Sequence, residues 1–286
     1  MNDTLSVTLE GERLGRRLGS GGPALTIQDI QARDSVRGLE RLSLCDWPGR
    51  MSAVLFFGGC NLRCPTCHNA DLAWTPERFP AIYPADVTRF LKKRAPWLDG
   101  LVITGGEPTI VPGLIDYLVE LAEVGLPVKL DTNGLQPDVV EELLARNLVA
   151  CFAVDVKGPP GLYPALTGGL ADEARARDGL ERIFALAKGA PDRFYFRMTR
   201  VPALSDADAA EARAWLPSQF KLIIQSYVEP RRTHAQADTQ EGRTAGNLVG
   251  GAHRPAHLEG AQGQWREGPP ARLAPGPQGG EPARRG

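Results

Sequence analysis

The sequence predicts an α/β fold, a partial (β/α)6 parallel barrel with disordered N- and C-terminal extensions. Two observations support this prediction. Short apolar or β-branched runs alternate with longer amphipathic segments, which is typical of repeated βα units. Polar residues also follow the apolar runs, as they do at the active rim of a parallel barrel. A chain of 286 residues is long enough to bury one core of roughly two hundred residues.

Six strands are expected, each an apolar run bounded by turn residues: Ser52 to Phe57, Leu101 to Thr104, Val128 to Asp131, Phe152 to Val156, Phe194 to Thr199 and Lys221 to Gln225. The amphipathic segments between them predict five helices: Pro84 to Arg94, Gly113 to Val124, Pro137 to Arg146, Asp172 to Lys188 and Asp206 to Trp215. Right-handed crossovers between parallel strands would curl such a sheet into an incomplete barrel.

Three regions follow from this reading. Residues 1–36 are rich in Gly, Arg and Ser and are interpreted as a partly disordered extension. Residues 37–232 form the predicted core domain. Residues 233–286 are rich in Gly, Ala, Pro and Arg with few aliphatic anchors, so the free energy of burial would not offset the ordering entropy, and we expect a disordered tail.

The composition is that of an ordinary globular protein. Hydrophobic residues make up 42% of the chain and the formal net charge is -1, so nothing favours a nucleic-acid partner. The longest apolar run, around Ala53 to Phe57, is too short to cross a bilayer, and the polar N-terminus has no secretory segment. We therefore expect a cytoplasmic protein with neither a membrane nor a nucleic-acid partner.

Three of the five cysteines crowd into eight positions. Cys60, Cys64 and Cys67 have a C-x3-C-x2-C spacing in a loop after the first strand. In a reducing compartment such crowding indicates metal or redox chemistry rather than disulfides. Cys45 and Cys151 stand apart and are expected to fill space.

A soft metal centre suits three closely spaced thiolates. An iron-sulfur cubane usually takes four Cys ligands, so three would leave one iron open to another ligand. Three alternatives remain: a thioredoxin-like dithiol of Cys64 and Cys67, a zinc site completed by a distant His, and coincidental structural cysteines. His68 is too close to Cys67 in sequence for easy ligation of the same zinc ion.

The cysteine spacing after a first strand resembles the signature of the radical S-adenosylmethionine enzymes. The resemblance implies that Cys60, Cys64 and Cys67 hold a 4Fe-4S cluster, and that the amino and carboxylate groups of S-adenosylmethionine chelate the open iron. Reductive cleavage would then give methionine and a 5'-deoxyadenosyl radical. The resemblance covers residues 36–230.

The ITGGEP segment matches the glycine-rich strand end of that family. The resemblance implies that Gly105 and Gly106 approach the methionine amino group, with the Glu107 carboxylate nearby. Glycine permits close backbone approach of a ligand. The alternative is an ordinary turn between a strand and a helix.

KLDTNG and VDVK each place an Asp at the end of an apolar strand, where a charge is costly unless it is paired or binds something. By resemblance, Lys157 pairs with the cofactor carboxylate, and Asp131, Thr132 and Asp155 together hold a monovalent cation. The alternative is a structural Asp-Lys pair that bridges neighbouring strands.

Three further positions are predicted to contact the cofactor: Thr66, Arg197 and Thr199. Thr66 stands where many relatives have an aromatic residue close to the adenine, so the backbone and His68 are expected to hold that ring. Arg197 and Thr199 end the fifth strand and are candidate cofactor contacts, or else solvated charges and hydroxyls at the rim. No separate catalytic residue is predicted beyond the cluster ligands.

The CHN segment at Cys67 and the SLCDWPGR segment at residues 43–50 both resemble the activating enzymes of glycyl radical proteins, in particular the anaerobic ribonucleoside-triphosphate reductase activating proteins. The resemblance implies removal of a glycine α-hydrogen from a partner reductase, with a flavodoxin or ferredoxin as electron donor. Two rivals remain: a radical enzyme on a small molecule, similar to 7-carboxy-7-deazaguanine synthase, and a non-enzymatic zinc-binding interaction module.

Overall fold

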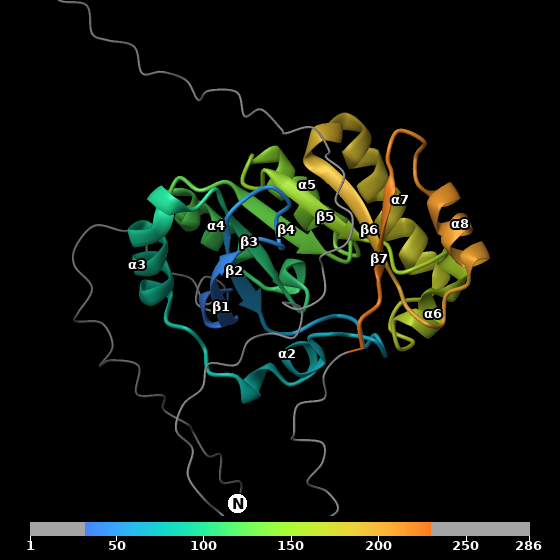
Figure 1. The fold of residues 1–286 in the computed structure, drawn as a ribbon, viewed down its shortest axis with the longest axis horizontal. Helices are drawn as coiled ribbons and strands as arrows, with labels where there is room; N and C mark the ends of the chain where they lie inside the picture. The colour runs from blue at the N-terminus through green and yellow to red at the C-terminus, as the bar shows by residue number, and fades with distance from the viewer. Residues whose placement is uncertain (1–31, 230–286) are drawn as a thin grey trace, which may run out of the picture.

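The computed structural model describes residues 32–229, and these contain one seven-stranded sheet whose strands follow one another in chain order (Figure 1). β1 pairs with β2 in antiparallel fashion, and every later pair is parallel. The strands are β1 (Val36–Ser43), β2 (Ser52–Phe57), β3 (Gly100–Gly105), β4 (Val128–Thr132), β5 (Cys151–Asp155), β6 (Phe194–Arg200) and β7 (Leu222–Ser226). The predicted partial parallel barrel is confirmed.

β1 was not among the predicted strands. Val36 and Ser43 at its ends are buried, but most of the residues between them are only partly buried or exposed. Arg37, Glu40 and Arg41 interrupt the apolar alternation that identifies a strand. Charged side chains are common on edge strands because they discourage pairing with other chains.

The five predicted helices are present, with ends that shift by at most two residues: α3 (Pro84–Arg94), α4 (Leu114–Ala122), α5 (Pro137–Ala145), α7 (Glu173–Gly189) and α8 (Asp206–Trp215). Two shorter helices were not predicted, α2 (Ala70–Trp74) and α6 (Tyr163–Leu166). Helices of about one turn show no usable periodicity in a sequence.

Local sequence signals fix where several of these helices begin. Pro84 and Pro137 occupy the first turns of α3 and α5, where the missing N–H of proline is not needed. The Asp172 side chain accepts a hydrogen bond from the third residue of α7. Ser205 and Asp208 form a reciprocal capping box at α8. These caps set the lengths of the loops that carry the site.

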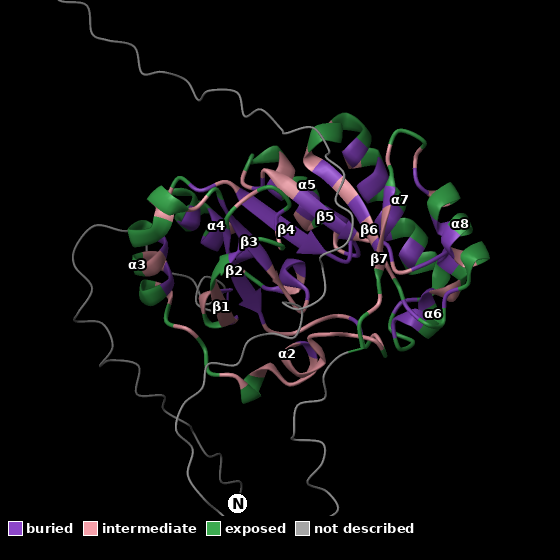
Figure 2. Ribbon diagram, in the orientation of Figure 1, coloured by how far each residue is buried: buried purple, intermediate pink, exposed green. Residues whose placement is uncertain are grey.

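The middle strands β2 to β5 are mostly buried on both faces (Figure 2). One face packs against the helices in the main core, to which the strands contribute Leu55, Ile103, Leu130, Val154 and Phe196. A smaller cluster of Trp47, Val54, Phe56 and Val102 lies on the other face. Trp47 lies in the turn that connects β1 to β2, which is closed by a hydrogen bond from Arg50 N to Trp47 O (3.0 Å).

Ala32 and Val36 are already fully buried, although the predicted core begins at residue 37. The predicted tail at 233–286 and residues 1–31 of the predicted extension lie outside the described residues. Along residues 32–229, no helix combines the length and the apolar character that a bilayer crossing would need.

Candidate active site

A single cavity at the carboxyl ends of β2 to β6 brings the predicted site residues together. The loop after β2 contributes its cysteines, and the ends of the next four strands contribute the glycines and the charged side chains. The predicted residues that line it are Cys60, Cys64, Thr66, Cys67, His68, Gly105, Gly106, Glu107, Asp131, Thr132, Asp155, Lys157, Arg197 and Thr199. The polar residues that follow the predicted strands therefore meet at one rim of the sheet.

The three clustered cysteines have free, partly buried thiols. Leu62, which is 2% exposed, anchors the loop in the core, and its N–H donates to Cys60 Sγ (3.4 Å). A turn is closed by the hydrogen bond from Cys67 N to Cys64 O (3.0 Å). The loop thus holds its cysteines against the cavity through its own backbone.

The thiols fit a centre that supplies strong positive charge. Burial raises the pKa of Cys60 to about 12 and also raises the pKa of Cys67, so both need a metal ion to become thiolates near neutral pH. Among the described residues, no three His, Cys, Asp or Glu side chains are placed to hold one metal ion. Three thiols that line one cavity suit an iron-sulfur cubane, in which each thiolate binds its own iron.

Gly105 and Gly106 are needed for packing within the protein. A Cβ on Gly106 would lie 1.8 Å from the carbonyl oxygen of Gly59, and one on Gly105, which has a φ of +124°, would lie 2.3 Å from that of Phe57. Hydrogen bonds from Gly106 N to Phe57 O and from Glu107 N to Gly59 O, both 2.8 Å, hold the segments together. The close approach expected for a ligand is made here by the start of the cysteine loop.

Glu107 joins the ends of β3 and β4. The residue is 1% exposed. Its carboxylate accepts hydrogen bonds from Thr109 N (3.1 Å), Thr109 Oγ1 (2.6 Å), Thr132 Oγ1 (2.8 Å) and Asn133 N (2.6 Å). Burial raises its pKa, although these hydrogen bonds oppose the shift. The side chain expected to serve the cofactor is thus fully engaged within the protein.

Two hydrogen bonds made by asparagine side chains were not predicted from the sequence. Asn133 Nδ2 donates to Asn61 Oδ1 (2.7 Å) and Asn69 Nδ2 donates to the Gly105 carbonyl (3.2 Å). Each bridge ties the cysteine loop to a neighbouring strand end. The available signal was that Asn61 lies within the cysteine cluster and Asn69 two residues after it, while Asn133 follows a predicted strand.

Five charged side chains from β4, β6 and the end of β5 with the loop after it form one continuous series of ion pairs. Asp155 pairs with Lys157 Nζ (2.9 Å) and with Arg197 Nε (2.6 Å), and Arg197 also reaches Asp131 (3.3 Å). Asp131 pairs in turn with Lys129, whose side chain is fully buried. Lys129 was missed, although its i, i+2 spacing from Asp131 puts both on one face of the strand.

The members of this series keep each other charged. Burial would raise the pKa of Asp155, but Arg197 and Lys157 outweigh it and hold that pKa below its usual value. Burial would likewise lower the pKa of Lys129, yet the Asp131 carboxylate raises it. All are therefore ionised near neutral pH.

Aromatic residues position two of the remaining groups. The buried Tyr163 hydroxyl accepts a hydrogen bond from Lys157 N (3.0 Å), which fixes the backbone at the end of β5. His68 makes an edge contact with Tyr227, with ring centroids 5.9 Å apart. The imidazole is thereby oriented at the wall of the cavity.

The two isolated cysteines differ from one another. Cys151 is partly buried and packs against the smaller cluster, as expected for a small apolar side chain. The prediction that Cys45 fills space is wrong, because this residue is exposed in the segment between β1 and β2.

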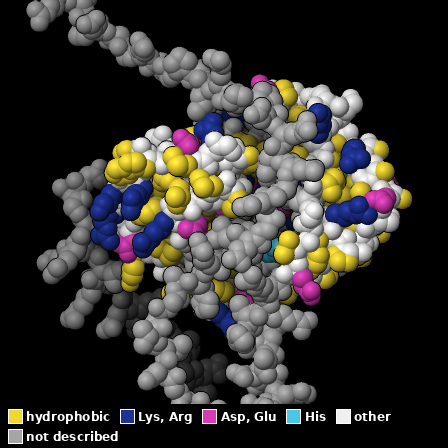
Figure 3. All heavy atoms as spheres, in the orientation of Figure 1, with side chains coloured by type: hydrophobic (Ala, Val, Ile, Leu, Met, Phe, Trp, Pro, Cys, Tyr) yellow, Lys and Arg dark blue, Asp and Glu magenta, His cyan; other side chains and the backbone are white. Residues whose placement is uncertain are grey.

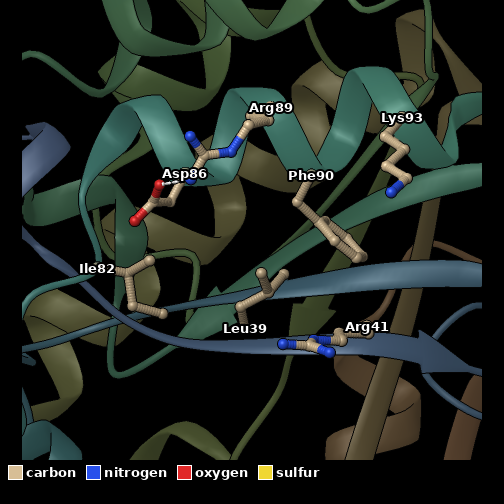
Figure 4. A pocket seen from close by; sticks show the side chains of 7 residues that line it. All are labelled: Leu39, Arg41, Ile82, Asp86, Arg89, Phe90 and Lys93. Carbon is tan, nitrogen blue, oxygen red and sulfur yellow. Dashed lines mark hydrogen bonds and ion pairs between the residues drawn. The ribbon is translucent and has the colours of Figure 1, made fainter.

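A second hollow lies between β1 and α3, outside the cavity that holds the cysteines (Figure 4). Basic side chains gather over this part of the surface (Figure 3). The hollow is lined by Leu39, Arg41, Ile82, Asp86, Arg89, Phe90 and Lys93. It contains none of the predicted site residues.

Residues 54–216 match the family model described as the Radical SAM superfamily. A protein of Methanocaldococcus jannaschii with the provisional name glycyl-radical enzyme activating enzyme is 33% identical over 68% of this chain and 80% of its own. Pyruvate formate-lyase-activating enzyme of Clostridium pasteurianum is 27% identical over 60% and 71%. 7-Carboxy-7-deazaguanine synthase of Hyperthermus butylicus is 38% identical over 31% and 37%.

Replacing Gly106 with Ala should destabilise the protein. The added methyl group meets the Gly59 carbonyl, so the cysteine loop must move, at a cost of about 2 to 3 kcal/mol in the free energy of unfolding. Denaturant unfolding measures this. Gly189→Ala is the control, because nothing lies near that Cβ position; equal stabilities of the two variants would contradict the packing argument.

Removing the Glu107 carboxylate should cost on the order of 3 kcal/mol, because Glu107→Ala leaves buried donors of Thr109, Thr132 and Asn133 without an acceptor. Thermal unfolding of Glu107→Ala and of the exposed control Glu123→Ala tests this. A melting temperature unchanged in both would show that Glu107 does not brace the site.

Proposed function

The chain belongs to the radical SAM superfamily, and from this premise we propose that it activates a glycyl radical protein, an anaerobic ribonucleoside-triphosphate reductase. Membership of the superfamily implies a 4Fe-4S cluster and S-adenosylmethionine. The observation that carries the proposal is the single cavity at the strand ends, which is lined by three thiols and by the Lys157 ammonium.

In this proposal Cys60, Cys64 and Cys67 each hold one iron, and the fourth iron takes the amino and carboxylate groups of S-adenosylmethionine. The bound cluster would supply the electron that divides S-adenosylmethionine into methionine and a 5'-deoxyadenosyl radical. The protein's part would be to hold three irons through these thiols, which line the cavity, and to supply no side chain to the fourth. The rigid attachment of the loop to β3 and β4 supports that part.

Other lining residues would orient the nucleotide. Lys157 is our candidate partner for the cofactor carboxylate, since an ammonium has three donors and Asp155 takes one of them. The backbone at Gly105 and Gly106 would accept the amino group, and His68 with Thr66 would border the adenine. Arg197 would act through Asp155 and Asp131 rather than on the cofactor directly.

The proposed substrate is one glycine of a partner protein. The bound cofactor would supply the radical that removes its α-hydrogen, which would give 5'-deoxyadenosine and a glycyl radical on the partner. The choice of a reductase is supported by the CHN and SLCDWPGR segments. Activation of a glycyl radical protein is supported by the relatives from M. jannaschii and C. pasteurianum. The name of the first gives a glycyl-radical enzyme as its target, and the name of the second gives pyruvate formate-lyase.

A flavodoxin or ferredoxin is the proposed electron donor, because the cluster must be reduced before each cleavage. Such chemistry requires a reducing compartment, and free, clustered thiols persist in one. We therefore keep the cytoplasm as the proposed location.

A second candidate is a radical enzyme acting on a small molecule. It is favoured by the similarity to 7-carboxy-7-deazaguanine synthase, which is 38% identical but only over 90 residues. The similarity to the M. jannaschii protein extends over 202 residues, which supports the activase as the first choice.

Replacing any one of Cys60, Cys64 and Cys67 with Ser should remove most cluster iron and sulfide and abolish reductive cleavage, because each is proposed to hold a different iron. Cys151→Ser is the matched control and should keep both. Iron and sulfide analysis with 5'-deoxyadenosine detection measures the outcome. Zinc without iron in the wild-type protein would instead support the interaction module.

The protein is incubated anaerobically with dithionite, S-adenosylmethionine and a candidate substrate. We expect a glycyl radical signal in electron paramagnetic resonance when that candidate is the reductase. Pyruvate formate-lyase and the substrate of the deazaguanine synthase serve as parallel arms. A glycyl signal only with pyruvate formate-lyase would support the activase function but identify pyruvate formate-lyase, not the reductase, as the substrate protein. 5'-Deoxyadenosine formed only with the small molecule would favour the second candidate.

A further inference from the structure

The two strand-end carboxylates expected to bind a monovalent cation are already fully paired. Asp131 has two cationic partners, Lys129 and Arg197, and Asp155 has Arg197 and Lys157. This series of ion pairs therefore contains three cationic side chains and two carboxylates. A sodium or potassium ion needs an uncompensated negative charge to bind. Beside these side chains it would instead be repelled by the excess positive charge.

The third expected ligand is also engaged elsewhere. Thr132 Oγ1 donates to Glu107 Oε1 (2.8 Å) and accepts a hydrogen bond from Gly134 N (3.1 Å). Asp131 and Thr132 are consecutive residues of β4, whose side chains point to opposite faces of a strand. Asp131, Thr132 and Asp155 therefore do not fit a shared cation.

Lys129 is the distinctive member of this network. Its side chain is fully buried, and its ammonium lies 5.8 Å from the centre of the Tyr195 ring, which provides a further favourable contact for a cation. It comes from the same strand face as Asp131, two residues before it. A buried lysine is rare unless it is paired, and this one has the Asp131 carboxylate as its partner.

We propose that the Lys129 ammonium is a built-in counter-ion, which takes the place of a monovalent metal ion beside Asp131 and makes S-adenosylmethionine binding independent of such ions. Lys129 acts as a positioning residue. It holds Asp131, which in turn holds Arg197 against Asp155, and Asp155 orients Lys157. The role in cofactor binding rests on the proposed function.

The first test uses the reconstituted full-length wild-type protein. S-Adenosylmethionine binding is measured by equilibrium dialysis in potassium, sodium or tetramethylammonium chloride at equal ionic strength. The dissociation constant should agree to within about twofold among the salts, since linkage between two ligands appears as a change in affinity. Rubidium binding, measured by dialysis and elemental analysis, should not reach one ion per chain.

The second test removes the ammonium. Lys129→Met keeps a side chain of similar length without charge, and Lys188→Met, in the last turn of α7, is the exposed control. The Lys129 variant should bind S-adenosylmethionine roughly tenfold more weakly in tetramethylammonium and recover in potassium, a coupling within the usual range. Rubidium should then bind near one ion per chain.

Several outcomes separate the possibilities. A wild-type protein that binds rubidium stoichiometrically, or whose cofactor affinity rises about tenfold with potassium, overturns the inference and leaves the proposed function standing. A folded Lys129→Met variant with unchanged affinity in every salt also overturns it. If the wild type binds neither cluster nor S-adenosylmethionine, the proposed function itself fails. The wild-type measurements decide even where the variant does not fold.

Discussion

The geometry of the site depends on one buried carboxylate. Glu107 lies between two strand ends and accepts from the backbone and hydroxyl of Thr109, the hydroxyl of Thr132 and the backbone of Asn133. Its own N–H binds Gly59 at the start of the cysteine loop. Three segments that are distant in sequence thus share one residue. Water cannot replace a hydrogen bond that a buried acceptor loses, so moving any one of these segments costs free energy. Each segment is therefore held in place by the others.

The ion pairs add a second constraint of a different kind. Two unit charges 4 Å apart interact by about 4 kcal/mol at an effective dielectric constant near 20, so each member of the series from Lys129 to Lys157 depends on its neighbour. Because Arg197 contacts both Asp131 and Asp155, a change in the charge or position of Asp131 on β4 also affects Asp155 on β5. The charged side chains at the rim therefore hold one another in position, and Lys129 is the buried end of this series of ion pairs.

The sequence predicted the place of the site better than the contacts within it. A strand followed by a polar residue is a local pattern, and parallel strands bring such residues to one rim, which is why Cys60 and Lys157 were found. Partners across the sheet depend on strand register, which the sequence does not show. The pairing of Glu107 with Asn133 and of Arg197 with Asp131 was therefore missed. Lys129 was a local omission, since its spacing from Asp131 was visible.

The inner face of the sheet also limits how a substrate reaches the site. Trp47, Val54, Phe56 and Val102 pack together there, and Gly100 lies so close to the indole that a Cβ would come within 2.6 Å of it. Below the rim, the interior is thus filled by side chains and by buried Lys129. A reacting group must arrive at the strand ends, beside the cysteines. For a macromolecular substrate this favours a glycine, whose lack of a side chain lets the backbone come close to the cavity.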